Sequence, residues 1–225
     1  MSVNRPQPPQ SEEELLIRAR LLAGLTLSEL ATKYNQKLPK STLHAKGWIG
    51  QLIELTLGAT ASSLAEPDFQ LIGIELKTLP LTASGKPKES TYVCTVPLTN
   101  LHEQTWEDTW LKRKLQRVLW LPIEADKSIP LAQRHIGSAI LWSPNKTESE
   151  QLRQDWEELM ELVCLGKLDQ ISSHMGHVLQ IRPKGANAKS LTTTLDEEGN
   201  TIQTLPRGFY LRPEFTGRIL QEYYA

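Results

Sequence analysis

The sequence has little cysteine and no long apolar run. Its two cysteines, Cys94 and Cys164, are too few for a disulfide framework or a cysteine-based metal site, and they are typical of a reducing cytoplasm. No apolar stretch approaches the roughly 20 residues that span a bilayer. Residues 1–10 are rich in Pro and Gln and have no apolar core like that of a signal peptide. We therefore expect a cytoplasmic protein with no membrane association and a short flexible N-terminus.

Excess positive charge is also missing, because 25 Lys and Arg face 26 Asp and Glu, a net charge of −1. Many nucleic-acid-binding proteins are strongly basic, so DNA binding by this chain would need local positive charge. Two basic clusters could supply it, and each could equally be a solvated face. They are Lys112, Arg113, Lys114 and Arg117, and then Arg182, Lys184, Lys189, Arg207 and Arg212.

Length and pattern indicate one mixed α/β domain over 11–225, because 225 residues with 39% hydrophobic and 23% charged residues are ordinary for a globular protein. Capping boxes predict helix starts at Ser11/Glu14, Thr26/Glu29 and Thr147/Glu150. Further helices are predicted over 47–57 and 213–224, and the third capped helix ends near 165. Strands are predicted over 69–80, 91–97, 118–123, 178–181 and 205–211. Helices thus come first and a central sheet follows.

The strand predicted over 69–80 carries the candidate chemistry. Successive strand side chains alternate in direction, so Leu76 faces the core while Glu75 and Lys77 share the other face, toward which Asp68 could curl back. Two carboxylates and a lysine are the minimum set for metal-assisted phosphodiester hydrolysis. The triplet also occurs by chance in many chains, and Glu75 with Lys77 could be a solvated strand face. Its position inside an apolar run favours a site.

A second carboxylate-bearing surface is predicted on the helix over 47–57. On a helical wheel, Glu54 lies opposite the apolar residues, together with Gly47, Gly50 and Gly58. Glycine inside a helix is destabilising by about 0.5–1 kcal/mol relative to alanine, so its presence there needs a reason. Two interpretations stay open. A ligand or backbone approaches this face closely, or the helix packs tightly on the sheet with Glu54 at the rim.

Several ordered runs resemble the MutH family, the GATC-specific strand-nicking endonucleases of methyl-directed mismatch repair. The resemblance covers roughly residues 11–220. It is carried by Lys46-Gly-Trp-Ile-Gly50, Glu54, Leu57-Gly-Ala, Asp68-Phe, Gly73-Ile-Glu75-Leu-Lys77-Thr, Lys114-Leu-Gln-Arg-Val-Leu-Trp120, Ser128-Ile-Pro-Leu-Ala-Gln-Arg134, Asp155-Trp-Glu-Glu-Leu-Met160, Gln180-Ile-Arg-Pro-Lys-Gly-Ala-Asn-Ala-Lys189 and Leu205-Pro-Arg-Gly-Phe-Tyr-Leu211.

The resemblance implies a restriction-endonuclease-like fold: a central mixed sheet flanked by helices, in two lobes around a DNA cleft. Asp68, Glu75 and Lys77 would be the catalytic triplet, with Glu54 completing the site and Lys114 near the scissile phosphate. Asp68 and Glu75 would hold one or two Mg²⁺ ions. A monomer in the bacterial cytoplasm would nick the unmethylated strand of hemimethylated GATC sites, activated by MutL after MutS has found a mismatch.

The resemblance also implies a set of DNA-binding residues, which comprises Lys46, Glu89, Arg182, Pro183, Lys184 and Tyr210. The fork of Arg182 suits a guanine edge, Glu89 a cytosine amino group and Lys184 a phosphate. The ring of Tyr210 could sense the adenine methyl group sterically. Tyr92 departs from the phenylalanine that the resemblance implies at this position, and one aromatic ring in place of another is compatible with packing. Packing or surface charge is the alternative role for residues of this set.

Three other functions are weighed against the nickase. A GATC-type restriction endonuclease would cut both strands and so needs a dimer or a second copy of the site, whereas the sequence has no repeat. A non-catalytic DNA-binding module would be expected to have lost a metal ligand or Lys77. An unrelated metal-binding α/β protein would not share the long ordered resemblance.

The C-terminal helix could be a partner surface or a packed terminal element.

Overall fold

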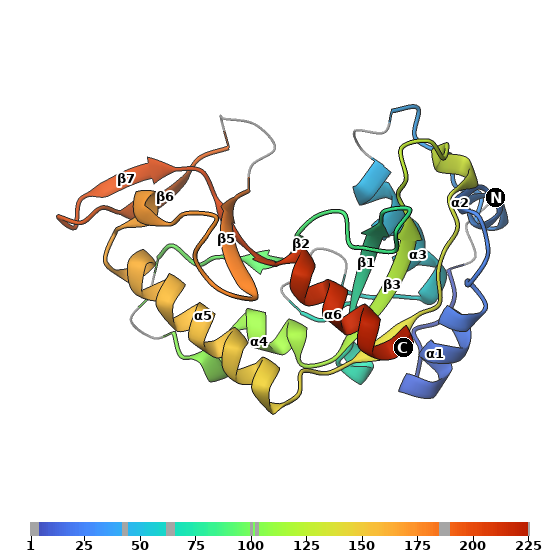
Figure 1. Cartoon of the computed structure of the whole chain (residues 1–225), viewed down its shortest axis with the longest axis horizontal. Helices are drawn as coiled ribbons and strands as arrows, with labels where there is room; N and C mark the ends of the chain where they lie inside the picture. Colours follow the sequence, from blue (N-terminus) through green and yellow to red (C-terminus); the bar gives the residue numbers. More distant parts are fainter. Residues whose placement is uncertain are drawn as a thin grey trace. The chain divides into compact units, whose positions relative to one another are not determined.

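The computed structural model describes residues 5–41, 45–61, 66–99, 101, 104–184 and 190–224. The chain forms two compact units, each described separately below (Figure 1). The first comprises Met1–Glu89, Gln116–Ser143 and Ile219–Ala225, and the second comprises Ser90–Leu115 and Pro144–Arg218. No helix in the described part of the chain is long and apolar enough to cross a membrane.

The first unit places three helices before a mixed three-stranded sheet. The helices are α1 (Glu12–Arg20), α2 (Leu27–Lys33) and α3 (Ala45–Leu57), and the strands are β1 (Glu75–Leu81), β3 (Val118–Glu124) and β4 (Ile140–Trp142). The strand order is β1-β3-β4, with β1 parallel to β3 and β3 antiparallel to β4. The predicted mixed α/β class with helices preceding a sheet is confirmed, although the short strand β4 was not predicted.

Two of the three predicted capping boxes form. The one at α2 has both of its bonds, and the one at α1 has the bond to the serine hydroxyl. The Ser11 hydroxyl accepts the Glu14 N–H at the start of α1, and Thr26 and Glu29 bond reciprocally at the start of α2. The third box was predicted wrongly at Thr147. Helix α5 (Lys146–Cys164) begins two residues earlier, because the Asn145 side chain accepts the Glu148 N–H at 2.9 Å and Glu148 returns the bond. Asparagine caps helices at least as well as threonine, so the earlier start is favoured.

The strand predicted over 69–80 begins only at Glu75. Residues Gln70–Ile72 form a single turn of 3-10 helix (η2), and Gly73 follows in the left-handed region at φ 65°. This backbone conformation has little steric cost for glycine alone. Phe69 and Ile74 then bridge each other across the turn. The turn reverses the chain before β1, which sets the position of Asp68.

The core of the first unit lies between the helices and the sheet. Leu15 of α1, Ile53 of α3, Ile74 before β1 and Leu121 of β3 are all fully buried in one apolar cluster. Leu76 belongs to the same cluster, so the predicted inward direction of this side chain is confirmed. The packing joins α3 to β1 and β3, and it therefore fixes the two elements that carry the candidate carboxylates.

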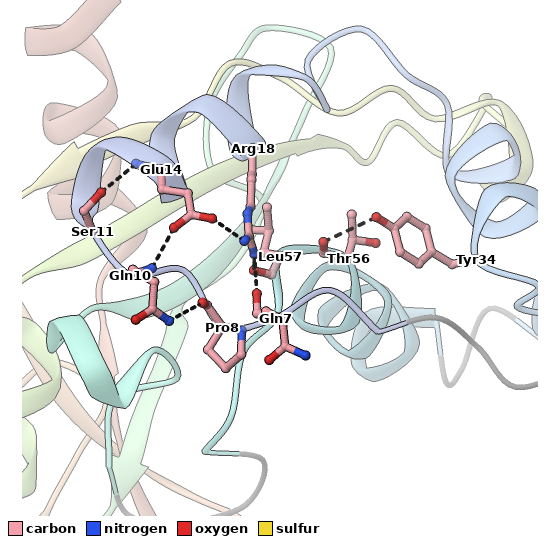
Figure 2. A network of polar contacts seen from close by, with 9 residues as sticks. All are labelled: Gln7, Pro8, Gln10, Ser11, Glu14, Arg18, Tyr34, Thr56 and Leu57. Atoms are coloured by element: carbon pink, nitrogen blue, oxygen red, sulfur yellow. Dashed lines mark hydrogen bonds and ion pairs between the residues drawn. The ribbon is translucent and has the colours of Figure 1, made fainter.

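Residues 5–10, expected to be a flexible lead-in, make defined contacts with α1 (Figure 2), and Arg5 donates to the Ala59 carbonyl just beyond the end of α3. Pro9 is buried, and the backbone N–H of Gln10 bonds Glu14 at 2.8 Å. The backbone carbonyl of Gln7 accepts Arg18 at 2.7 Å. The described part of the N-terminus is therefore held against the first unit.

The second unit is built on an antiparallel sheet of order β2-β8-β5. Its strands are β2 (Thr91–Thr95), β5 (Leu179–Pro183) and β8 (Arg207–Leu211), with a separate hairpin of β6 (Thr192–Leu195) and β7 (Thr201–Thr204). Its helices are α4 (Trp110–Leu115) and α5, and neither α4 nor the hairpin strands were predicted. Buried Asp155 of α5 accepts the N–H groups of His177, Val178 and Leu179 at 2.7–2.8 Å, which ties α5 to β5.

Helix α6 (Pro213–Tyr224) begins in the second unit and ends in the first, starting at the proline as predicted. Ile219 and Leu220 are buried, at 1% and 4% exposure. The Tyr223 hydroxyl donates to the Leu141 carbonyl at 2.6 Å, and Tyr224 donates to the Ser138 carbonyl. This helix was considered as a partner surface or as a packed terminal element. Its buried apolar residues and the hydrogen bonds of its last two tyrosines fit the packed element.

Candidate functional site

The predicted triplet comes together at the start of β1. Glu75 is buried at 2% exposure, and its Oε1 lies 2.5 Å from the Nζ of Lys77, two residues along the same strand. Asp68 is 8% exposed, and its Oδ2 accepts the backbone N–H of Leu76 at 2.9 Å. The turn after Asp68 therefore returns this carboxylate to the strand that carries Glu75 and Lys77. The predicted curl toward β1 is confirmed, through a turn rather than through a longer strand.

The electrostatics of this group centre on Asp68. The pKa of Asp68 is raised from 3.8 to about 6, mainly by burial and then by the negative charge of Glu75. Lys77 and the Leu76 N–H act in the opposite direction, and Glu54 adds a smaller upward effect. Two buried carboxylates close together repel each other where water solvates them poorly. Such an arrangement favours the binding of a cation.

Glu54 stands on α3 beside an open helix face. A Cβ added at Gly47 would meet no described atom within 4 Å outside the helix's own backbone, and one added at Gly50 would meet only the Oε1 of Glu54, at 3.9 Å. Neither glycine is needed for a tight helix–sheet contact, so that interpretation is wrong at both positions. Gly58 differs, because it has φ +84° and an added Cβ would lie 2.8 Å from the Gln7 carbonyl.

The donor set fits Mg²⁺ in part. Carboxylate oxygens are the protein ligands that Mg²⁺ prefers, and Asp68 and Glu75 supply them from one strand and the turn before it. Across the described ranges, no three His, Cys, Asp or Glu side chains are gathered closely enough to form a complete protein cage. Mg²⁺ usually keeps several waters and contacts substrate oxygens, so two protein carboxylates are a sufficient contribution.

Lys46 and Glu89, both expected to bind DNA, contact each other within the first unit. The Nζ of Lys46, at the start of α3, lies 2.5 Å from Oε1 of Glu89, and both side chains are about half exposed. An exposed ion pair of this kind contributes little to stability. Breaking this ion pair therefore costs little free energy, so each side chain is available to contact a nucleotide instead.

Lys114, the fifth expected catalytic residue, lies on α4 in the second unit, whereas the other four lie in the first. It is 8% exposed. Burial is unusual for a lysine on a helix with two basic neighbours, Lys112 and Arg113. Its role near the scissile phosphate stays a prediction.

The remaining expected DNA-binding residues gather on the β2-β8-β5 sheet. The Arg182 guanidinium lies 5.8 Å from the ring centroid of Tyr210, and the Lys184 ammonium lies 3.6 Å from that of Tyr92. The two tyrosine rings meet edge to face at 5.4 Å. Arg182, Pro183 and Lys184 are exposed. Two aromatic rings with one cation over each make a surface suited to phosphates and base edges.

Comparison with known proteins identifies the family. A family model described as DNA mismatch repair enzyme MutH matches residues 57–155. The chain is 54% identical over 215 residues to the DNA mismatch repair protein MutH of Haemophilus ducreyi, covering 96% of this chain and 95% of the relative. The chain belongs to the MutH family. The MutH proteins of Yersinia enterocolitica and Escherichia coli are 52% and 50% identical, over 97% and 100% of this chain and 96% and 99% of the relatives.

Two residues support the arrangement of side chains on the β2-β8-β5 sheet but were not singled out in the sequence. The Ser90 hydroxyl accepts Gln180 Nε2 at 2.6 Å and Arg182 Nη1 at 3.4 Å, so it helps to place the arginine. A Cβ added at Gly208 would lie 2.9 Å from the Tyr92 ring and 3.0 Å from the Tyr210 ring. The only local signal was Gly208 inside a strand, which indicates a close approach by another group.

Proposed function

We propose that this chain is a Mg²⁺-dependent DNA endonuclease of the restriction-endonuclease-like superfamily, which nicks the unmethylated strand of hemimethylated GATC sites in mismatch repair. The observation that carries the proposal is the group of Asp68, Glu75 and Lys77 at the start of β1, in which both carboxylates are buried and Lys77 pairs with Glu75. The 50–54% identity to MutH proteins over nearly the whole chain supports the same function.

Each residue of the site has a chemical task in this proposal. Asp68 and Glu75 would hold one or two Mg²⁺ ions, with Glu54 completing the site from α3. The metal, when bound, polarises the phosphoryl oxygen and lowers the pKa of a bound water. Lys77, held by Glu75 at 2.5 Å, orients the attacking water and stabilises negative charge that develops on the phosphate. Lys114 would stabilise the same phosphate from α4.

Base recognition is assigned to residues of both units. Arg182 would donate two hydrogen bonds to a guanine edge, and Glu89 would accept from a cytosine amino group once Lys46 turns to a phosphate. Lys184 would bind a phosphate, beside Pro183. Tyr210 would discriminate methylated from unmethylated adenine, because a rigid ring packed against Tyr92 can sense one extra methyl group sterically. This assignment implies two lobes around a DNA cleft.

The cellular partners follow from the same proposal. The related proteins are named for DNA mismatch repair, which supports a bacterial cytoplasmic enzyme acting on double-stranded DNA. We propose that MutL activates a monomeric enzyme and that MutS acts indirectly, through MutL. The net charge of −1 supports this dependence, because few positive charges give weak non-specific DNA affinity, and a loading partner then raises the rate.

The experiment is nicking of circular DNA with one GATC site, in unmethylated, hemimethylated and fully methylated forms, with Mg²⁺ and with or without MutL. We expect a nick confined to the unmethylated strand of the hemimethylated circle. Asp68→Ala should abolish the nick and leave DNA binding largely intact. Rapid double-strand cutting without MutL would instead identify a restriction endonuclease, and no cutting of any form would identify a DNA-binding module.

A further inference from the structure

The C-terminal end of α3 lies one turn beyond Glu54 and is closed by hydrogen bonds to the Glu54 backbone. The N–H groups of Gly58 and Ala59 both donate to the backbone carbonyl of Glu54, at 3.0 and 2.9 Å. Gly58 adopts the left-handed conformation typical of a helix end. The backbone of Glu54 is therefore part of the helix cap, and any shift of the cap moves this residue.

The segment that begins at the last residue of α3 and includes the cap, residues 57–61 (the bridge segment), also holds Asp68. The N–H groups of Thr60 and Ala61 donate to the Asp68 carbonyl, at 2.8 and 3.3 Å. Glu54 and Asp68 are thus both anchored, through their backbone carbonyls, to the same five residues. The position of the bridge segment sets the spacing between the two acidic residues.

Contacts from the N-terminal segment, residues 5–10, and from α1 fix the bridge segment in turn (Figure 2). The Nη1 of Arg18 donates to the Leu57 carbonyl at 3.1 Å and to the Gln7 carbonyl at 2.7 Å. The guanidinium of Arg5 donates to the Ala59 carbonyl. A cation at the carbonyl end of a helix is favoured by the helix dipole and satisfies carbonyls that lack a partner within the helix.

The N-terminal segment and Arg18 pack so closely around Gly58 that the bridge segment cannot shift without displacing them. An added Cβ at Gly58 would lie 2.8 Å from the Gln7 carbonyl and 3.2 Å from both Arg18 Nη1 and the Pro6 carbonyl. Arg18 is itself oriented by Glu14, one helical turn earlier, and Glu14 accepts the Gln10 N–H at 2.8 Å. The N-terminal segment, α1 and the bridge segment are therefore closely packed at one point.

We propose that Arg18 and the N-terminal segment are positioning elements of the metal site, which set the separation of Glu54 from Asp68 through the bridge segment. This inference rests on the proposed function, in which these acids take part in metal binding. In this role Arg18 acts through the backbone carbonyls of Leu57 and Gln7 rather than as a metal ligand. Groups that orient metal ligands affect affinity, and their loss reduces it by about 10–100-fold.

The test compares Arg18→Ala with Arg20→Ala, an exposed arginine on the same helix. We expect Arg18→Ala to raise the Mg²⁺ concentration for half-maximal nicking by about tenfold, the lower end of that range because the arginine acts through the backbone. Arg20→Ala should behave as the wild type. Mn²⁺ binding to the free protein, followed by the electron paramagnetic resonance of unbound Mn²⁺, should weaken by the same factor.

Two further variants separate positioning from loss of stability. Asp155→Asn destabilises the second unit and should leave Mn²⁺ binding unchanged. Arg5→Ala removes a second side-chain hydrogen bond to the bridge segment while leaving α1 whole, so it tests the inference even if Arg18→Ala does not fold. Unchanged metal dependence in Arg5→Ala and in folded Arg18→Ala would overturn the inference. A wild type that neither nicks DNA nor binds Mn²⁺ would instead reject the proposed function.

Discussion

Substitution of Asp68 by asparagine should stabilise the metal-free protein at neutral pH. Asp68 has its pKa raised from 3.8 to about 6, mainly by burial, so the folded protein binds this proton more tightly than the unfolded chain does. The ionised carboxylate therefore lowers the free energy of unfolding as pH rises from about 3.8 to about 6, and the full loss is present above that range. At about 1.4 kcal/mol for each pH unit, this loss is about 2–3 kcal/mol.

Asparagine removes the charge and keeps an oxygen that can accept the Leu76 N–H. We expect the free energy of unfolding of Asp68→Asn, measured by urea denaturation without divalent metal, to exceed that of the wild type by about 2–3 kcal/mol at pH 7.5. Near pH 4 the two proteins should differ little, because Asp68 is protonated in the fold. Added Mg²⁺ should stabilise the wild type and not the variant.

Asp155→Asn is the matched control, since it is also a buried aspartate but its carboxylate accepts three backbone N–H groups. Asparagine has only one accepting oxygen, so this variant should lose about 1.5–3 kcal/mol. We therefore expect the free energy of unfolding to rise in Asp68→Asn and to fall in Asp155→Asn. If Asp68→Asn is no more stable than the wild type at pH 7.5, or equally stabilised at pH 4, the electrostatic account of the site is wrong.

Three other substitutions test the catalytic and recognition residues. Lys77→Met should lower the nicking rate by at least about 100-fold with DNA affinity nearly unchanged, as measured in single-turnover and binding assays. Lys184→Ala should weaken binding to all DNA sequences alike and reduce the slope of log affinity against log salt by about one, and a sequence-dependent loss would contradict its assignment to phosphate. Gly208→Ala should push apart the Tyr92 and Tyr210 rings and reduce discrimination between methylated and unmethylated GATC, which nicking of paired substrates measures; unchanged discrimination would show that the ring pair does not sense the methyl group.

Local patterns in the sequence were sufficient for several features of the site. Alternation along β1 placed Glu75 and Lys77 on one face and Leu76 in the core, because a strand repeats every two residues whatever it packs against. The cap of α2 at Thr26 was equally predictable, since both its bonds join residues three positions apart. The glycines beside Glu54 left two interpretations open, and only the structure showed that the helix face at Gly47 and Gly50 is open. The family, too, could be recognised from ordered motifs alone.

Tertiary structure decided what depends on contacts between distant segments. The turn that returns Asp68 to β1 is closed by its bond to Leu76, eight residues away, and an extended strand was the better prediction from alternation alone. Arg18 closes the end of α3 from 39 residues earlier, where the sequence shows only a charge on an amphipathic helix. Asp155 meets its partners 22–24 residues away in the same manner. Strand alternation and helix caps depend on residues a few positions apart, so residue spacing encodes them. The bonds of Asp68, Arg18 and Asp155 form only when packing brings a charged side chain next to backbone groups that need a hydrogen-bond partner.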